Sequence, residues 1–377
     1  MALIDILPRA HNALATARAA EAMRITDAIR DQGVVGVLGE AEVGKTETVR
    51  QAIAPLLRPS TLIHLDLDGA ASDESAAFLL AKQIARALVG PIDFSLLSAG
   101  ALLPSRVEAG RIELAELLGA DGLEEATRAW PSGTYPLPKA LRALATLASR
   151  GAVVLWIDHL EAPSLTPRHP LQIDRMLWGV RELSQRAPEL RVVLSGREGA
   201  GPLALNETAA FHQQGRWLSL DLPLSTSWEA TAAELGVPAG VVHQLRDLLD
   251  GHPATMLLAL IEIADGEGIR HPYEVVRDLA SSDAGLTGRT MQHARSLHRL
   301  GGQVLTQIAL GEKPYAATQR GRATQQEITK VLGRLRLAGL LRHDAEGWSV
   351  INPLVAIGIR QQVRSIPAAD AAADPDN

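Results

Sequence analysis

The chain has 377 residues, more than one hydrophobic core usually serves, so we expect two or three domains. Hydrophobic residues make up 46% and charged residues 21%, a balance that permits a folded core and argues against a largely disordered chain. Because there is no cysteine, disulfides, thiolate metal ligands and cysteine nucleophiles are excluded.

Two further features of the sequence bear on location and on binding partners. The first residues show no basic lead followed by an apolar core, and no run of about eighteen apolar residues occurs, so we expect a cytoplasmic protein that does not enter a membrane. The net charge is −6, yet Leu286–Arg364 carries 12 Lys and Arg against 4 Asp and Glu. This basic module either meets a polyanion or docks on the acidic remainder of the same chain.

Strand-like and helix-like segments alternate along the first 225 residues. Helices are expected at His11–Asp31, Thr46–Leu57, Ser75–Val89, Leu137–Arg150 and Leu171–Ala187. Buried strands are expected at Val34–Leu38, Thr61–Leu67, Ala152–Ile157, Arg191–Leu194 and Trp217–Leu222. The stretch Gly90–Pro138 gives no clear pattern. The alternation predicts an α/β fold, with a parallel sheet flanked by helices on both faces.

The pattern changes after Pro223. Ser227–Leu279 has helical periodicity without a convincing strand, and the basic module follows. We therefore divide the chain into an N-terminal helical segment (1–32), an α/β domain (33–225), a helical domain (226–285), a basic domain (286–364) and an acidic, disordered tail (365–377).

The most specific motif is Gly39-Glu40-Ala41-Glu42-Val43-Gly44-Lys45-Thr46, which has the spacing G-x-x-x-x-G-K-[ST]. It follows an apolar run and opens a helix, as a phosphate-binding loop requires. The glycines let successive backbone N–H groups point at phosphate oxygens, and the helix start adds its own N–H groups and positive dipole. Lys45 would neutralise the β- and γ-phosphates, and the Thr46 hydroxyl would bind Mg²⁺. Glu47, directly after the motif, completes the predicted binding segment.

The fourth position of the loop is Glu42, where many such loops have glycine. A carboxylate there places negative charge near the phosphates unless it turns to solvent. Nucleotide binding is therefore the firmer expectation, and hydrolysis is expected to be slow.

Two later strands end in polar residues. Val153–Asp158 places Asp158 at the carboxyl edge of the predicted sheet, where it would hold Mg²⁺ opposite Thr46. Glu161, three residues on, is the candidate for polarising the attacking water, with a solvent-facing loop residue as the alternative. His159 receives no role. Arg197 follows the strand Arg191–Leu194 and is the candidate sensor of the γ-phosphate, with a surface arginine as the alternative.

Together these residues resemble the STAND and archaeal-type branch of the AAA+-like P-loop ATPases. The resemblance rests on GEAEVGKT, LWIDHLE, LSGRE and Gly251-His252-Pro253-Ala254, in that order, and covers roughly Ala20–Gln361. It implies ATP and Mg²⁺ as cofactors, a catalytic set of Lys45, Asp158, Glu161 and Arg197, and a helical lid in which Pro253 lies against the base. For Gly251-His252-Pro253 the alternative is a helix-breaking turn. The sequence departs from the family at Glu42 and lacks a second acidic residue directly after Asp158. No arginine finger is assignable.

The basic module has the order helix, helix, two-stranded hairpin, which looks like a winged helix-turn-helix. Gln303–Ala309 is the first helix, and a capping box of Thr324 and Glu327 opens the second. Leu340–His343 and Trp348–Ile351 are the expected wing strands. The candidate DNA contacts lie off the apolar face of the second helix or on the wing: Gln325, Gln326, Thr329, Lys330, Arg334, Arg342 and His343. The alternative is a lid or protein-docking module.

The sequence thus predicts an ATP-binding and ATP-hydrolysing switch that couples nucleotide state to double-stranded DNA through a winged helix. A second interpretation is a STAND-type signalling ATPase that forms nucleotide-dependent homo-oligomers through protein contacts. A third is a transcription regulator that binds ATP or ADP without useful turnover. The preference for adenine over guanine follows from the resemblance alone.

Overall fold

A computed structural model of the chain describes residues 15–57, 60–70, 73–89, 137–162, 173–198, 207, 209–223, 225–266, 270–282, 284–315 and 323–365. The chain divides into two compact units. The sheet unit comprises Glu21–Gly39 and Thr48–Ser219. The helical unit comprises Met1–Ala20, Glu40–Glu47 and Leu220–Asn377. The segment Glu40–Glu47, which holds most of the phosphate-binding motif, therefore belongs to the helical unit although it directly follows a strand of the sheet unit.

The sheet unit is built on a five-stranded sheet with the order β2-β3-β4-β1-β5. The pairs β2·β3, β3·β4 and β1·β4 are parallel. The strands are β1 (Val34–Gly39), β2 (Thr61–Asp66), β3 (Val153–Asp158), β4 (Leu190–Arg197) and β5 (Arg216–Leu220). All five lie where the sequence predicts strands, and the parallel α/β architecture is confirmed.

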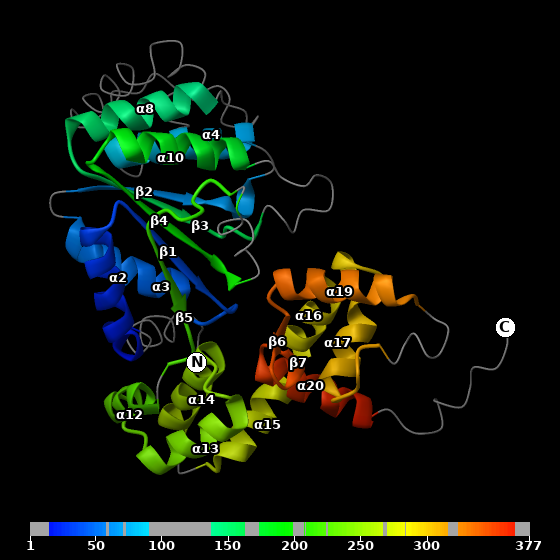
Figure 1. Cartoon of the computed structure of the whole chain (residues 1–377). Helices are drawn as coiled ribbons and strands as arrows, with labels where there is room; N and C mark the ends of the chain where they lie inside the picture. The colour runs from blue at the N-terminus through cyan, green and yellow to red at the C-terminus, as the bar shows by residue number, and fades with distance from the viewer. Residues whose placement is uncertain are drawn as a thin grey trace, which may run out of the picture. The chain divides into compact units, whose positions relative to one another are not determined.

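The central strands are apolar because helices cover both of their faces. Every residue of β1 and of β3 is buried, as expected for a parallel sheet enclosed by helices. Figure 1 shows α4, α8 and α10 on one face and α2 and α3 on the other. Their bounds are α2 (Ala19–Asp31), α3 (Lys45–Ile53), α4 (Asp73–Val89), α8 (Leu137–Arg150) and α10 (Asp174–Arg186).

The register of the strands brings their polar ends to one edge. Asp66 of β2 is paired with Asp158 of β3, and Gly39 of β1 with Arg197 of β4. Parallel strands have their carboxyl ends at the same edge of a sheet, which is where ligands of open α/β folds bind. Gly39, Asp158 and Arg197 therefore share the edge predicted to carry the site.

The first part of the helical unit has four successive helices after β5. They are α12 (Ser225–Glu234), α13 (Ala239–Leu249), α14 (Pro253–Asp265) and α15 (Pro272–Ser282). Their core includes Trp228, Leu245, Met256 and Leu260. Pro253 is the first residue of α14, where its missing N–H costs nothing. The predicted run of helices is confirmed.

The second part of the helical unit has the order α16 (Ala284–Leu297), α17 (Gly301–Ala309), α19 (Gln325–Leu337), β6 (Leu341–Asp344), β7 (Gly347–Val350) and α20 (Pro353–Ser365). The capping box of α19 is present, because Thr324 Oγ1 accepts the Glu327 N–H and Glu327 accepts the Thr324 N–H. Its buried face is Ile328, Val331, Leu332 and Leu335. β6 and β7 form an antiparallel hairpin. The predicted helix, helix and hairpin are thus all present.

Some expectations lie partly outside the described residues. These are the start of the first helix at 11–14, most of the unpatterned stretch 90–138, the link at 316–322 and the tail from 366 onward. Among the helices that the structure describes, none is both long and apolar enough to cross a bilayer.

Candidate nucleotide-binding site

The phosphate loop connects the end of β1 to the start of α3. Glu42 and Gly44 have φ values of 59° and 87°, in the left-handed region. Alternating right- and left-handed residues turn successive backbone N–H groups toward one side, which makes a cradle for an anion. Lys45 is the first residue of α3, and its Nζ donates to the Glu40 carbonyl. The loop therefore follows a strand and opens a helix, as the sequence motif predicts.

Arg18 contacts the loop from the N-terminal segment, and sequence reasoning missed it. Its side chain is buried, and Nη2 donates to the Val43 carbonyl at 2.8 Å. A trans peptide is planar, so the direction of the Val43 carbonyl also fixes the opposite direction of the Gly44 N–H. Arg18 thereby orients one of the N–H groups of the cradle. No local sequence pattern around Arg18 indicates this contact with Val43.

The carboxylate of Glu42 does not turn to bulk solvent alone. Its Oε2 accepts a hydrogen bond from Asn352 Nδ2 at 2.8 Å, and it lies 3.7 Å from His252 Nε2. Burial of His252 lowers the pKa of its imidazole, against the opposing influence of Glu42. The neutral form of His252 is therefore favoured, and the contact with Glu42 is weaker than a full ion pair.

Glu40 has its own basic neighbour. Arg342 of β6 lies 3.7 Å from Glu40, forms an ion pair with Asp250, and donates to Ser349 Oγ at 2.9 Å. Asp250 ends α13 in a left-handed conformation directly before the Gly251-His252-Pro253 turn. Arg342, predicted as a DNA contact on the wing, thus holds carboxylates of the loop and of α13 within the helical unit.

Asp158 lies at the carboxyl end of β3 with only 2% of its surface exposed. Its Oδ1 accepts hydrogen bonds from Ser195 Oγ at 2.5 Å and from the His159 N–H at 2.9 Å. Ser195 in turn accepts the Trp156 indole N–H at 2.7 Å. The carboxylate is therefore held in one orientation by the neighbouring strand β4, as a metal ligand needs. Ser195 and Trp156 are supporting residues that the sequence motif did not indicate.

Glu161 and Arg197, predicted for separate roles, contact each other. Arg197 Nε lies 3.1 Å from Glu161 Oε1, and the Arg197 backbone N–H donates to Oε2 at 2.9 Å. Glu161 is 2% exposed. Gly196 leaves room for this pair, since a Cβ there would lie 3.1 Å from Oε2. The solvent-facing alternative for Glu161 is wrong, because its carboxylate is buried and orients Arg197.

A second polar pair lies beside Asp158. His159 Nδ1 is 2.8 Å from Asp66 Oδ1, on the neighbouring strand β2. Burial alone would raise the pKa of Asp66, but hydrogen bonds from the Asp68 N–H and His159 lower it. Burial alone would lower the pKa of His159, but Asp158 and Asp66 raise it. The register of β2 and β3 creates this pair, which one strand read by itself does not show.

The residues present fit Mg²⁺ bound with a nucleotide better than a metal held by protein alone. In the described parts of the chain, no three His, Asp or Glu side chains are grouped as a metal site. Mg²⁺ usually takes one or two protein oxygens together with phosphate oxygens and water. Thr46 and Asp158 are the residues that the sequence predicts as these oxygen ligands.

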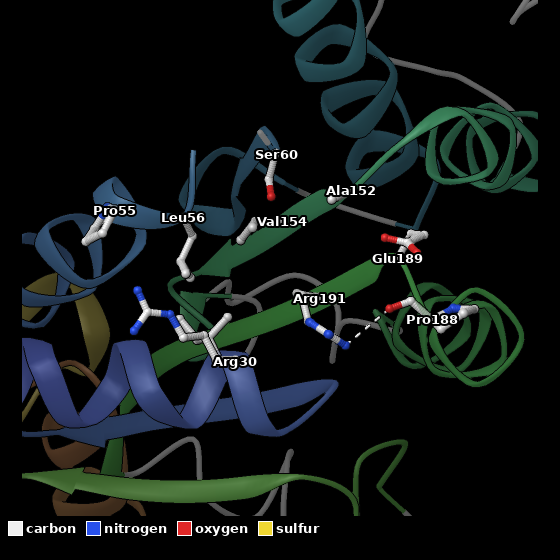
Figure 2. Close-up of a pocket in the computed structure, with 10 residues that line it drawn as sticks. Arg30, Pro55, Leu56, Ser60, Ala152, Val154, Pro188, Glu189 and Arg191 are labelled. Carbon is white, nitrogen blue, oxygen red and sulfur yellow. Dashed lines mark hydrogen bonds between the residues drawn. The ribbon is translucent and has the colours of Figure 1, made fainter. Parts of the chain in front are cut away.

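A cavity of about 360 Å³ in the sheet unit lies at the opposite edge of the sheet (Figure 2). Ala152, directly before β3, Val154 of β3 and Arg191 of β4 line it at the amino ends of the strands. Arg191 donates to the Pro188 carbonyl at 3.2 Å there. This cavity is therefore separate from the carboxyl edge that holds Asp158.

The predicted DNA-contact residues have different surroundings. Gln325, Gln326, Thr329 and Lys330 are exposed on α19. Arg334 instead donates to the Leu297 carbonyl at 2.9 Å, at the end of α16. His343 is exposed and lies against the Trp348 ring, with 4.6 Å between the ring centroids. Two of the expected basic contacts, Arg334 and Arg342, are thus held by groups within the same unit.

No family model and no curated protein matches the sequence. Solved structures do match the fold. The Walker-type ATPase PABY2304 of Pyrococcus abyssi has a TM-score of 0.62 at 16% identity, over 91% of this chain and 95% of that one. The Aeropyrum pernix ORC1 protein in complex with DNA has a TM-score of 0.46 at 14% identity, over 92% of each chain. The RuvB Holliday junction branch migration motor of Thermotoga maritima has a TM-score of 0.38 at 14% identity, over 93% of this chain and 92% of that one.

The sheet order, the phosphate loop and the similarity to PABY2304 define the class. The chain has the fold of a P-loop ATPase. Identity this low supports the fold and carries no substrate or partner from one protein to the other.

Proposed function

We propose that the protein binds ATP with Mg²⁺, hydrolyses it slowly, and uses nucleotide state to control what its C-terminal helices and hairpin bind. The observation that carries this proposal is the phosphate loop. It leaves the carboxyl end of β1, has left-handed backbone at Glu42 and Gly44, and leads into Lys45 at the start of α3. The buried Asp158 at the same edge of the sheet supplies the carboxylate for Mg²⁺.

The proposed roles follow from position and charge. Lys45 binds the β- and γ-phosphates, and Thr46 and Asp158 hold Mg²⁺. Arg197 contacts the γ-phosphate, and Glu161 fixes the direction of its guanidinium. Pro253 lies against the base. Mg²⁺, when bound, neutralises phosphate charge as the γ-phosphoryl group is transferred to water.

The test is nucleotide binding by the purified chain, followed by steady-state hydrolysis. Lys45→Ala is expected to weaken Mg²⁺·ATP binding by at least about 100-fold, because a charge-assisted contact to phosphate is lost from a partly enclosed site. Lys139→Ala in α8 is the matched control, with no expected change. Wild-type affinity in Lys45→Ala would refute the proposal.

For the partner, we propose double-stranded DNA bound by a winged helix that α17, α19, β6 and β7 form. The exposed residues Gln325, Gln326, Thr329 and Lys330 on α19 support this assignment. Fluorescence anisotropy with a labelled 30-base-pair duplex tests it. Binding is expected to weaken steeply with salt, and Lys330→Ala is expected to lower affinity while Arg175→Ala on α10 does not.

One observation favours a second candidate, a switch that assembles through protein contacts. Arg334 and Arg342 are held by the Leu297 carbonyl and by Asp250, which reduces the charge available for DNA phosphates. This candidate predicts homo-oligomers that form with ATP and are indifferent to DNA. Light scattering after gel filtration, with ATP, ADP or no nucleotide, separates the two.

A further inference from the structure

Asn352 uses both ends of its side-chain amide, and one end contacts the phosphate loop. It directly precedes α20, where its Oδ1 accepts the N–H groups of Leu354 at 3.1 Å and Val355 at 3.3 Å. Because the oxygen caps the helix, the NH₂ group is the end that remains for Glu42. Nδ2 accordingly donates to Glu42 Oε2 at 2.8 Å. Because Oδ1 must face the N–H groups of α20, the side-chain amide of Asn352 has only one orientation that fits the cap.

Glu42 is costly at its position in two ways. Its φ of 59° lies in a region that disfavours side chains by about 1 kcal/mol, which glycine would avoid. Its carboxylate also adds negative charge beside the cradle in which the phosphates would bind. While Asn352 holds the Glu42 carboxylate, that carboxylate is kept away from the cradle. Without this hydrogen bond, the carboxylate is able to turn toward the cradle.

We propose that Asn352 is a positioning residue of the phosphate loop, which holds the Glu42 carboxylate against the start of α20 and so sets the affinity for nucleoside triphosphate. The proposal rests on the proposed nucleotide binding and adds a dependence on the C-terminal helix. Binding free energies are reciprocal, so bound nucleotide also stabilises the contact between the loop and α20. Glu42 therefore couples nucleotide binding at the loop to the start of α20.

Two substitutions separate the loop contact from the helix cap, and a third is the control. Asn352→Ser keeps a good N-cap and removes the contact, whereas Asn352→Asp keeps the cap and places a like charge at Glu42. The dissociation constant of Mg²⁺·ATP is expected to rise about three- to tenfold for Ser, because a hydrogen bond to a half-exposed charged group is lost. For Asp it is expected to rise further. Gln361→Ala, on the same helix, is the control and is expected to change nothing.

Glu42→Gly provides the decisive comparison. It removes both the charge and the backbone strain, so affinity is expected to equal or exceed that of the wild type. In this background Asn352→Ser and Asn352→Asp are expected to have no effect on the dissociation constant. A general loss of stability would instead persist in the Glu42→Gly background.

Hydrogen–deuterium exchange supplies a readout that does not depend on turnover. Nucleotide is expected to slow exchange of the amides of Leu354 and Val355 in the wild type and not in Glu42→Gly. Unchanged or tighter ATP binding in both Asn352 variants, with Lys45→Ala still abolishing binding, would overturn this inference alone. Wild-type binding by Lys45→Ala would instead overturn the proposed function on which it rests.

Discussion

The carboxyl edge of the sheet and the phosphate loop hold their acidic residues in opposite ways. At the sheet edge, Asp158 and Glu161 are each 2% exposed and are fixed by residues of β4. In the helical unit, the side chains of Glu42 and Asp250 are 48% and 59% exposed, and they contact Asn352 and Arg342. Both sets consist of carboxylates with polar partners, but only the first is enclosed.

This difference assigns different tasks to the two regions. Hydrogen bonds to buried charges are expensive to break, so the sheet edge is suited to keep one geometry for the metal and phosphate that we propose it binds. Exposed ion pairs contribute about 0–1 kcal/mol each and are easily exchanged. The contacts around Glu42 and Asp250 are therefore suited to change with the proposed nucleotide state, whereas those around Asp158 are suited to remain the same.

The strongest test of this contrast is the buried pair of Glu161 and Arg197. Glu161→Ala is expected to lower the free energy of unfolding by about 3 kcal/mol, because it removes the buried carboxylate that accepts from the Arg197 backbone N–H and pairs with its guanidinium. Urea denaturation measures this loss. Glu161→Gln keeps the shape and one acceptor, and is expected to lose about half as much. Glu198→Ala, the neighbouring acidic residue, is the control.

The same two variants test the water-polarising role predicted from the sequence. If Glu161 mainly positions Arg197, Glu161→Gln retains measurable hydrolysis and raises KM for ATP. Complete loss of kcat in a stably folded Glu161→Gln, with ATP affinity unchanged, would show that the carboxylate acts on the water instead.

A somewhat smaller effect is expected at Ser195, which links the Trp156 indole to Asp158. Ser195→Ala removes an acceptor from one and a donor from the other, and is expected to cost about 1–2 kcal/mol of unfolding free energy. It should also weaken the dependence of ATP binding on Mg²⁺, because Asp158 is less firmly oriented. Ser184→Ala, which removes a hydroxyl bonded only to its own helix, is the control. Equal losses in the two variants would contradict the enclosed-edge interpretation.

The sequence predicted what depends on neighbouring residues and missed what depends on strand order. The loop motif, all five strands and the capping box at Thr324 are local patterns, and each is present. The pairing of Asp66 with His159 and of Glu161 with Arg197 arises from the register of β2, β3 and β4, which no single segment contains. Likewise, Glu42 and Asn352 are 310 residues apart, so the carboxylate that sequence reasoning assigned to phosphates or solvent meets a helix cap instead.

The acid sensitivity of the helical unit provides a third test, at His252. Burial lowers the pKa of this imidazole in the folded chain, and Arg342 acts in the same direction while Glu42 and Asp250 oppose it. The unfolded chain then binds a proton more readily than the folded chain. Stability from this group is present above the ordinary histidine pKa of about 6.5 and is lost as pH falls below it.

Unfolding measured between pH 7.5 and 5 therefore has a component that His252→Gln should remove, since glutamine does not titrate. His271→Gln, an exposed histidine of the same unit, is the control. A pH dependence equally steep in His252→Gln and the wild type would show that other groups account for the acid sensitivity.

The smallest effect on stability is expected at Arg342. Substitution of this residue distinguishes a role in supporting the phosphate loop from a role in binding DNA. Its partners Glu40, Asp250 and Asp344 have side chains that are 23%, 59% and 45% exposed, so Arg342→Met should change the free energy of unfolding by less than about 1 kcal/mol. If Arg342 serves the loop, removing it takes away a positive charge that lies 3.7 Å from Glu40, beside the proposed phosphate site. ATP affinity then falls about two- to threefold at low salt, and the difference vanishes near 0.5 M NaCl.

If Arg342 serves DNA, ATP affinity is unchanged and the salt slope of duplex binding decreases by about one. One guanidinium cannot hold both Asp250 and a DNA phosphate with the same donors. If Arg342→Met weakens both ATP binding and DNA binding, DNA must therefore draw Arg342 away from the loop. DNA binding would then remove the positive charge that favours nucleotide binding.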